Sequence, residues 1–60
     1  MEEYAKKWER QHTGYVSTIN EYSFEFVETA YNGKLQKFIE VRKYTVMKSY
    51  FVKLGVNNYV

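Results

Sequence analysis

The sequence predicts an α+β fold, in which a short N-terminal helix packs on an antiparallel β-meander of three to four strands. Three observations support this fold class. A helical stripe opens the chain, apolar residues alternate with polar ones from Tyr15 onward, and Asn32-Gly33 gives a turn signal between two alternating segments. All 60 residues are expected to form one small domain, since a chain this short supports a single core.

Residues 2–12 are predicted to form the helix. Two Glu residues fall in its first turn, where the helix dipole favours acidic side chains, and basic residues follow. Tyr4, Ala5 and Trp8 lie on one stripe. Because so short a helix is marginal in isolation, we expect this stripe to pack on the sheet.

Strands are predicted over residues 15–19, 22–31, 34–46 and 49–54. The second is the clearest, because its aromatic residues alternate with polar ones. Asn-Gly is the most typical two-residue hairpin sequence, since both residues tolerate the positive φ of a type I′ turn. The turn near Met47 is poorly marked, and Gly55 is expected to end the last strand before a tail or short edge strand.

A two-residue turn would fix which side chains share a face. Phe24 would face Val41 on the core side, whose apolar residues are Phe24, Phe26, Leu35, Ile39, Val41, Val52 and Leu54. On the other side Glu25 would face Glu40, and opposed like charges destabilise a sheet by roughly 0.2–1 kcal/mol. A bulge that shifts the register is therefore the alternative.

No segment is left over to cover the face opposite the predicted core. We predict a partner-binding surface there, formed by Val27, Phe38, Tyr44, Phe51, Arg42 and Lys53. Protein interfaces are enriched in Tyr, Phe and Arg, which favours this interpretation. The alternative is an ordinary solvated sheet face, where aromatic residues only raise strand propensity.

Two classes of partner fit such a surface. A protein, including a second copy in a homodimer, is favoured because 20% of the residues are aromatic and a chain of this size does not bury them all. Single-stranded nucleic acid is the alternative, since exposed aromatics stack bases while Lys and Arg neutralise phosphates. Glu25 and Glu40 on the same face, and a net charge of only +2, weigh against nucleic acid.

Charge is unevenly distributed along the chain. The first thirty residues carry six Glu against three basic residues, whereas the last thirty carry five Lys and one Arg against Glu40 alone. This asymmetry predicts either an acidic partner for the second half or attraction between the two halves.

No catalytic, cofactor or metal site is predicted, and no small-molecule substrate is expected. One His, with no Cys and no Asp, leaves few reactive groups, and one helix on a sheet forms no deep pocket. Glu9 and His12 have the spacing of a carboxylate-bridged metal site. Such sites take further Glu and His ligands from other helices, so a capping or solvent-facing His12 is expected instead.

The absence of cysteine, of a signal sequence and of long apolar runs predicts a cytoplasmic protein without a membrane segment. Abundant Lys, Asn, Tyr and Glu, with no Pro or Asp, are typical of small phage or viral proteins, which would place the chain in the host cytoplasm. Together these features predict a non-catalytic regulator or inhibitor that binds the surface of a larger protein.

Overall fold

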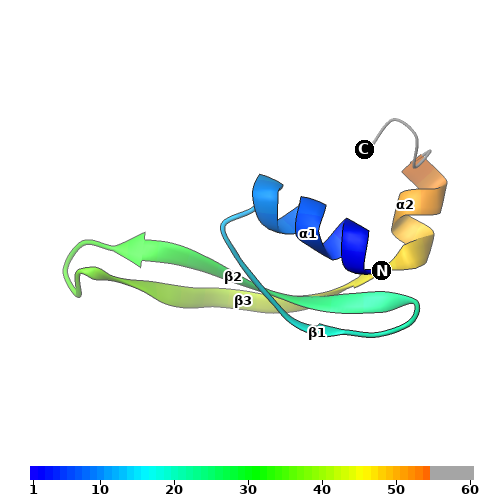
Figure 1. The fold of residues 1–60 in the computed structure, drawn as a ribbon. Helices are drawn as coiled ribbons and strands as arrows, with labels where there is room; N and C mark the ends of the chain where they lie inside the picture. The colour runs from blue at the N-terminus through cyan, green and yellow to red at the C-terminus, as the bar shows by residue number, and fades with distance from the viewer. Residues whose placement is uncertain (55–60) are drawn as a thin grey trace.

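The computed structural model describes the backbone of residues 1–54 and the side chains of residues 1–51. Its elements are α1 (Glu2–Gln11), β1 (Gly14–Ile19), β2 (Ser23–Asn32), β3 (Lys37–Met47) and α2 (Lys48–Leu54). The three strands form one antiparallel sheet in the order β1-β2-β3, and both helices lie on the same side of it (Figure 1). The α+β class and the meander are confirmed, while the tail predicted after Gly55 lies outside the described residues.

Helix α1 forms where the sequence predicts it and buries the expected stripe. Ala5 and Trp8 are its buried residues, and Tyr4 packs at the margin of the core. The helix ends because His12 turns to an extended conformation with φ −133°, while its N–H still donates to the carbonyl oxygen of Trp8 at 3.0 Å. Trp8 therefore sits in the last turn, directed at the centre of the sheet.

The core is an aromatic cluster between the sheet and the two helices. Phe24 and Phe26 of β2 and Phe51 of α2 are fully buried. The indole ring of Trp8 meets both β2 rings edge-on, with centroids 5.9 Å from Phe24 and 6.5 Å from Phe26. Edge-to-face pairs of this kind add about 0.5–1.5 kcal/mol each beyond the area they bury. The core is therefore small but dense in rings.

Strands β2 and β3 are joined by a four-residue loop and not by the predicted two-residue turn. Asn32 pairs with Lys37 across the loop. The Asn32 Oδ1 atom accepts hydrogen bonds from the backbone N–H groups of Lys34 and Leu35 at 2.9 and 3.0 Å. Gln36 takes a positive φ of 54° to close the loop. The Asn32 side chain thus stabilises the loop, as in an Asx turn. Because this loop is longer than the predicted turn, the predicted pairing of β2 with β3 is wrong.

The observed register reverses the faces of β3 beside the core. Phe24 lies opposite Val46 and Phe26 opposite Tyr44, whereas the prediction placed Val41 opposite Phe24. The shift is an odd number of positions, and an odd shift moves every side chain to the other face. Val41 has no partner in β2 and forms a β-bulge, so the bulge considered as the alternative is present.

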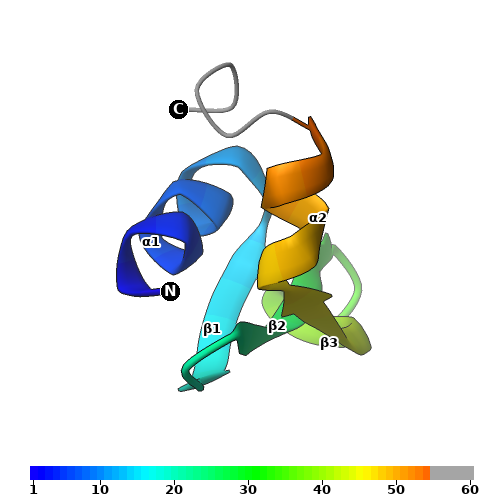
Figure 2. The ribbon, with the colours of Figure 1, turned by 90° about the vertical axis from the view of Figure 1, so that its right-hand side faces the viewer.

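Helix α2 takes the place of the predicted fourth strand over residues 49–54. It begins directly after β3, where the Lys48 N–H donates to the carbonyl oxygen of Tyr22 at 2.8 Å. The ring of Phe51 stacks on that of Tyr4, with centroids 4.4 Å apart and an interplanar angle of 12°. Helix α2 therefore buries a ring beside α1 and does not extend the sheet (Figure 2).

The hairpin of β2 and β3 extends well beyond the rest of the molecule (Figure 1). Register pairing of β1 with β2 ends at Glu28, so residues 30–41, here called the hairpin arm, form a two-stranded projection. The molecule measures 40 × 21 × 15 Å, and its radius of gyration of 12.9 Å exceeds the value of about 10 Å for a compact domain of this length. The arm thus lies outside the cover of either helix.

Candidate binding surface

The structure does not bring the predicted partner-binding residues onto one face. Phe51 is buried in the core and Tyr44 is half-buried at its margin. Val27 is buried on the opposite side of the sheet from Phe26, its neighbour in β2. Only Phe38 and Arg42 of the predicted set are exposed among the side chains described, and that of Lys53 lies outside them. The expectation of a shared face is therefore wrong.

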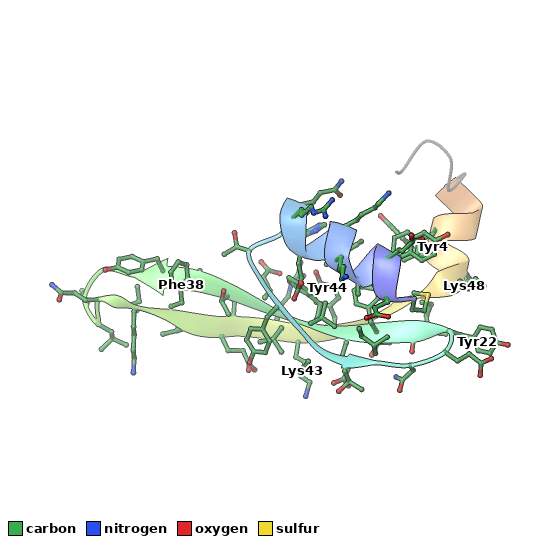
Figure 3. All side chains as sticks on the ribbon, in the orientation of Figure 1. Tyr4, Tyr22, Phe38, Lys43, Tyr44 and Lys48 are labelled. Carbon is green, nitrogen blue, oxygen red and sulfur yellow. The ribbon has the colours of Figure 1, made fainter. Side chains whose placement is uncertain are left out.

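Tyr44 belongs to the core because of the reversed register. The Trp8 Nε1–H donates a hydrogen bond to the Tyr44 hydroxyl at 3.0 Å, and the Tyr44 ring lies 5.8 Å from that of Phe26. The Arg42 guanidinium lies over the Tyr44 ring, with Cζ 5.2 Å from the ring centroid. Tyr44 thus closes the core at the base of the hairpin arm, beneath α1 (Figure 3).

The face of the sheet away from the helices is mainly polar. Tyr15, Val27 and Lys43 align across its three strands, and Lys43 points away from the helices (Figure 3). Polar side chains and one methionine surround this row, namely Thr18, Ser23, Glu25, Thr45 and Met47. The bare aromatic surface expected here does not form, since the β3 aromatics beside the core point to the other face.

Two ion pairs join β2 to β3. The Arg42 Nε atom lies 2.5 Å from Glu28 Oε1, and Lys43 Nζ lies 3.4 Å from Glu25 Oε1. The hydrogen bond and charge of Glu28 raise the pKa of the Arg42 guanidinium above its ordinary value. Part of the charge asymmetry between the two halves is therefore met inside the sheet.

Exposed apolar residues concentrate on the hairpin arm. Four large side chains there are more than half exposed: Tyr31 (59%), Leu35 (58%), Phe38 (61%) and Val41 (54%). Tyr31 and Phe38 face each other across the strands, with ring centroids 5.4 Å apart at 73°. Lys34 lies in the loop, and Lys37 precedes Phe38 in β3 with its side chain on the other face of the hairpin. Neither lysine forms an ion pair with any described residue. We call these six residues the arm surface; Figure 3 shows Phe38 beyond the end of α1.

Sequence reasoning found only Phe38 of the arm surface as a binding residue. Leu35 and Val41, placed in the core by the predicted register, are exposed because no element covers the arm. The relative lengths of the helix and the strands indicate that part of the hairpin stays uncovered. A ten-residue helix is about 15 Å long, whereas ten residues of antiparallel strand span about 34 Å. A single helix of this size therefore covers less than half of such a hairpin.

Glu9 and His12 both have structural roles. The His12 ring stacks on Trp8 at a centroid distance of 4.0 Å, and its Nδ1 lies 3.1 Å from the carbonyl oxygen of Trp8. The Glu9 Oε2 atom accepts a hydrogen bond from the backbone N–H of Val16 at 2.9 Å. Across the part of the chain that the structure describes, no three His, Cys, Asp or Glu side chains group as a metal site.

Comparisons with known proteins give no match: no family model matches the chain, and neither does any curated protein or solved structure. Within residues 1–54, neither helix has the length and apolar character needed to cross a lipid bilayer. The arm surface is the main exposed apolar feature of the described residues.

Proposed function

We propose that this chain is a small non-catalytic binding protein that acts by protein–protein interaction through the arm surface. The single observation that carries the proposal is the projecting arm, on which four large apolar side chains stay more than half exposed and which also carries Lys34 and Lys37. Large apolar side chains left exposed together on one projection are typical of an interaction site. A regulator or inhibitor that binds a larger protein would use such a projection to reach its target.

A protein partner suits the arm better than single-stranded nucleic acid does. Leu35 and Val41 are aliphatic and offer no ring on which a base could stack. Arg42 and Lys43 are already paired with Glu residues of β2, and Glu40 adds a negative charge to the arm. Two unpaired lysines give few phosphate contacts, and affinity for nucleic acid rises with each contact. The arm surface therefore has the composition of a protein interface.

The test is arm-dependent binding. The test uses a protein that binds the wild-type chain. The affinity of the variant Tyr31→Ser/Phe38→Ser for this protein should be lower by at least about tenfold, measured by calorimetry on the two purified proteins. The thermal midpoint of the variant should change by only a few degrees, because both rings are exposed. Tyr22→Ser is the matched control, since Tyr22 is 59% exposed at the other end of the sheet. Undiminished binding by the arm variant would contradict the proposal.

A titration with a single-stranded oligonucleotide at two salt concentrations separates the two partner classes. We expect no salt-dependent binding in the micromolar range. If such binding occurs and is abolished by Lys34→Glu/Lys37→Glu, nucleic acid replaces protein as the partner of the arm.

A further inference from the structure

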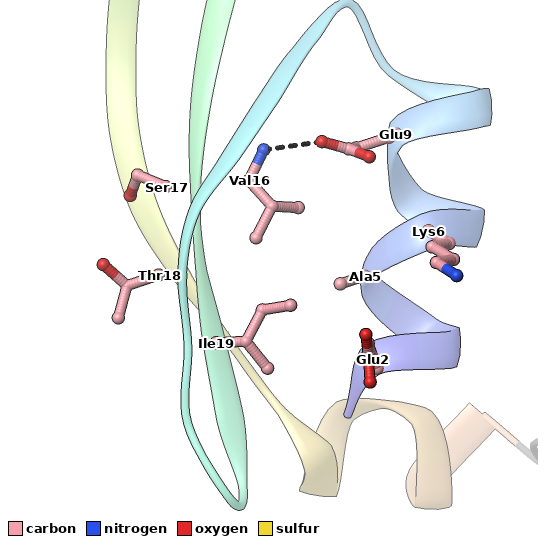
Figure 4. A pocket seen from close by; sticks show the side chains of 8 residues that line it. All are labelled: Glu2, Ala5, Lys6, Glu9, Val16, Ser17, Thr18 and Ile19. Atoms are coloured by element: carbon pink, nitrogen blue, oxygen red, sulfur yellow. Dashed lines mark hydrogen bonds between the residues drawn. The ribbon is translucent and has the colours of Figure 1, made fainter.

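A second surface on the same chain complements the arm surface. An open groove of about 420 Å³ runs between α1 and β1 (Figure 4), within the range of about 300–1,000 Å³ typical of ligand sites. We call this site the α1–β1 groove. The residues that line it are Glu2, Ala5, Lys6, Glu9, Val16, Ser17, Thr18 and Ile19. Ala5 lies at its centre, and the short side chain leaves room between helix and strand. The apolar floor and the space together suit the side chains of an extended segment.

The strand side of the groove is an open sheet edge. β1 pairs with β2 alone, so its other edge has no strand partner among the described residues. The Val16 N–H points away from β2 and is held by Glu9 across the groove (Figure 4). Because Glu9 already accepts this edge N–H, a segment in the groove would be held mainly by its side chains and not by backbone pairing with β1.

Charge distinguishes this groove from the arm. Glu2 and Glu9 are seven residues apart on α1, about 10 Å along the helix axis, and neither forms an ion pair with a described residue. Lys6 is the one basic residue among the described residues that line the groove, so the two carboxylates leave the lining with a net negative charge. Lys34 and Lys37 are the arm's unpaired cations. The arm points away from α1, so a chain does not place its arm in its own groove (Figure 1).

We infer that the arm surface of one copy occupies the α1–β1 groove of a second copy, and the reverse, in a two-fold symmetric dimer. This inference rests on the proposed function and names the protein partner of the arm. Leu35 and Phe38 supply the apolar contact with the groove. Lys34 and Lys37 lie near Glu2 and Glu9 of the other copy. Symmetry makes each contact twice, so a modest contact closes a discrete dimer and no open chain of copies grows.

The exposed side chains of the arm can supply their own share of such an interface. Stable interfaces bury about 800 Å² from each partner, so two equivalent contacts need on the order of 400 Å² from each arm and groove. An aromatic side chain buries about 150–250 Å², and both rings of the arm are about three-fifths exposed. Together with Leu35 and Val41 they supply an area of this order.

Sedimentation across a concentration series tests the inference on the full chain. We expect wild type to reach twice the monomer mass, and Lys34→Glu/Lys37→Glu to raise the dissociation constant at least about tenfold, because attraction becomes repulsion. Glu2→Lys/Glu9→Gln should do the same, and Gln keeps an oxygen for the Val16 N–H. Arg10→Glu/Lys48→Glu, the control, makes the same change in net charge as the arm variant and should leave the dimer intact.

Mixing the two charge variants gives the decisive result. A dimer of either variant with itself would contain two repulsive contacts. In a mixed dimer, the acidic arm of the first variant meets the basic groove of the second, and the remaining arm and groove are both wild type. We therefore expect a mixed dimer of near wild-type affinity. A mixture that stays monomeric, or a wild-type chain that is monomeric at all concentrations, would overturn the inference. If the wild-type chain captures no other protein through its arm, that result counts against the proposed function and not against the dimer. Failure of the proposed function and failure of the dimer are therefore distinguishable.

Engineered cysteines identify the contact directly, because the chain has none of its own. Ile19→Cys in the groove and Leu35→Cys on the arm should form a disulfide only when the two variants are mixed. If Leu35→Cys alone cross-links as fast as the mixture, the arms meet each other and the groove assignment is wrong.

Discussion

Gly14 is the residue whose replacement the structure constrains most directly. Its φ of +149° is one that L side chains rarely adopt. A Cβ atom at this position would collide with the carbonyl oxygen of Val27 and lie 2.8 Å from the Phe26 ring. We therefore expect Gly14→Ala to lower the free energy of unfolding by about 2 kcal/mol or more, measured by urea unfolding.

Gly33 provides the matched control. A Cβ atom there meets nothing within 4 Å, so Gly33→Ala should change the free energy of unfolding by less than about 0.5 kcal/mol. Equal effects of the two substitutions would contradict the close approach of β1 to β2 at Gly14. Nothing in the local sequence signals this contact, because a close backbone approach between strands leaves no local pattern.

Among single residues, those whose environment depends on one element were predicted best. Trp8 packs on the sheet as expected, since the helical stripe alone determines its direction. Phe38 is exposed as expected. Tyr44 and Phe51 were placed wrongly, because the direction of each depends on a second choice, the register of β3 for Tyr44 and helix against strand for Phe51.

At the scale of elements, the register of the β2–β3 hairpin was the step that sequence did not determine. Asn32-Gly33 fits a type I′ turn, but the Asn side chain also closes a longer loop by accepting two backbone hydrogen bonds. The opposed Glu25 and Glu40 of the predicted register were the available signal against it. In the observed register Glu25 lies opposite Thr45 and forms an ion pair with Lys43. Charge pairing thus agrees with the longer loop.

Phe51 is the buried residue of helix α2 among the described side chains, and the half-exposed Tyr50 adds an edge-on contact with Trp8 at 5.9 Å. Tyr, Phe and Val favour strands, so local propensity predicted a strand for this segment. The segment is helical where Phe51 enters the core between Tyr4 and Phe24, at centroid distances of 4.4 and 6.3 Å. The fit of one side chain in a core outweighs a propensity scale that spans only about 1 kcal/mol.

Removal of the Phe51 ring should therefore destabilise the protein strongly. We expect Phe51→Ala to lower the free energy of unfolding by about 3–5 kcal/mol, which is comparable with the whole stability of a chain this small. Circular dichroism with urea unfolding measures the loss. Ser49→Ala, an exposed position of the same helix, is the control and should be close to neutral. A Phe51→Ala protein as stable as the control would show that α2 is not held by this ring.

At the scale of the whole molecule, the core and the arm are separate along the chain. Among the side chains that the structure describes, every buried apolar residue lies outside residues 30–41: Ala5, Trp8, Phe24, Phe26, Val27, Val46 and Phe51. The two ion pairs of the sheet lie at the base of the arm and not along it. Selection for stability alone gives no reason to keep a long exposed hairpin, which supports a binding role for it.

This separation predicts that the arm can be shortened without loss of the fold. Residues 30–39 are replaced by Asn-Gly, so that Thr29 and Glu40, which already pair, are joined by a two-residue hairpin turn. We expect the thermal midpoint to change by a few degrees at most. The radius of gyration in small-angle scattering should fall from 12.9 Å toward about 10 Å, and both the dimer and partner binding should disappear.

A variant in which residues 33–36 become a four-residue Gly/Ser loop keeps the length of the arm and should keep the larger radius. The comparison separates shape from stability, because only the first variant removes the projection. If the shortened chain unfolds while the loop variant does not, the arm is needed to bring β2 and β3 into register. The exposed side chains of the arm would then be a consequence of folding and not a surface kept for a partner.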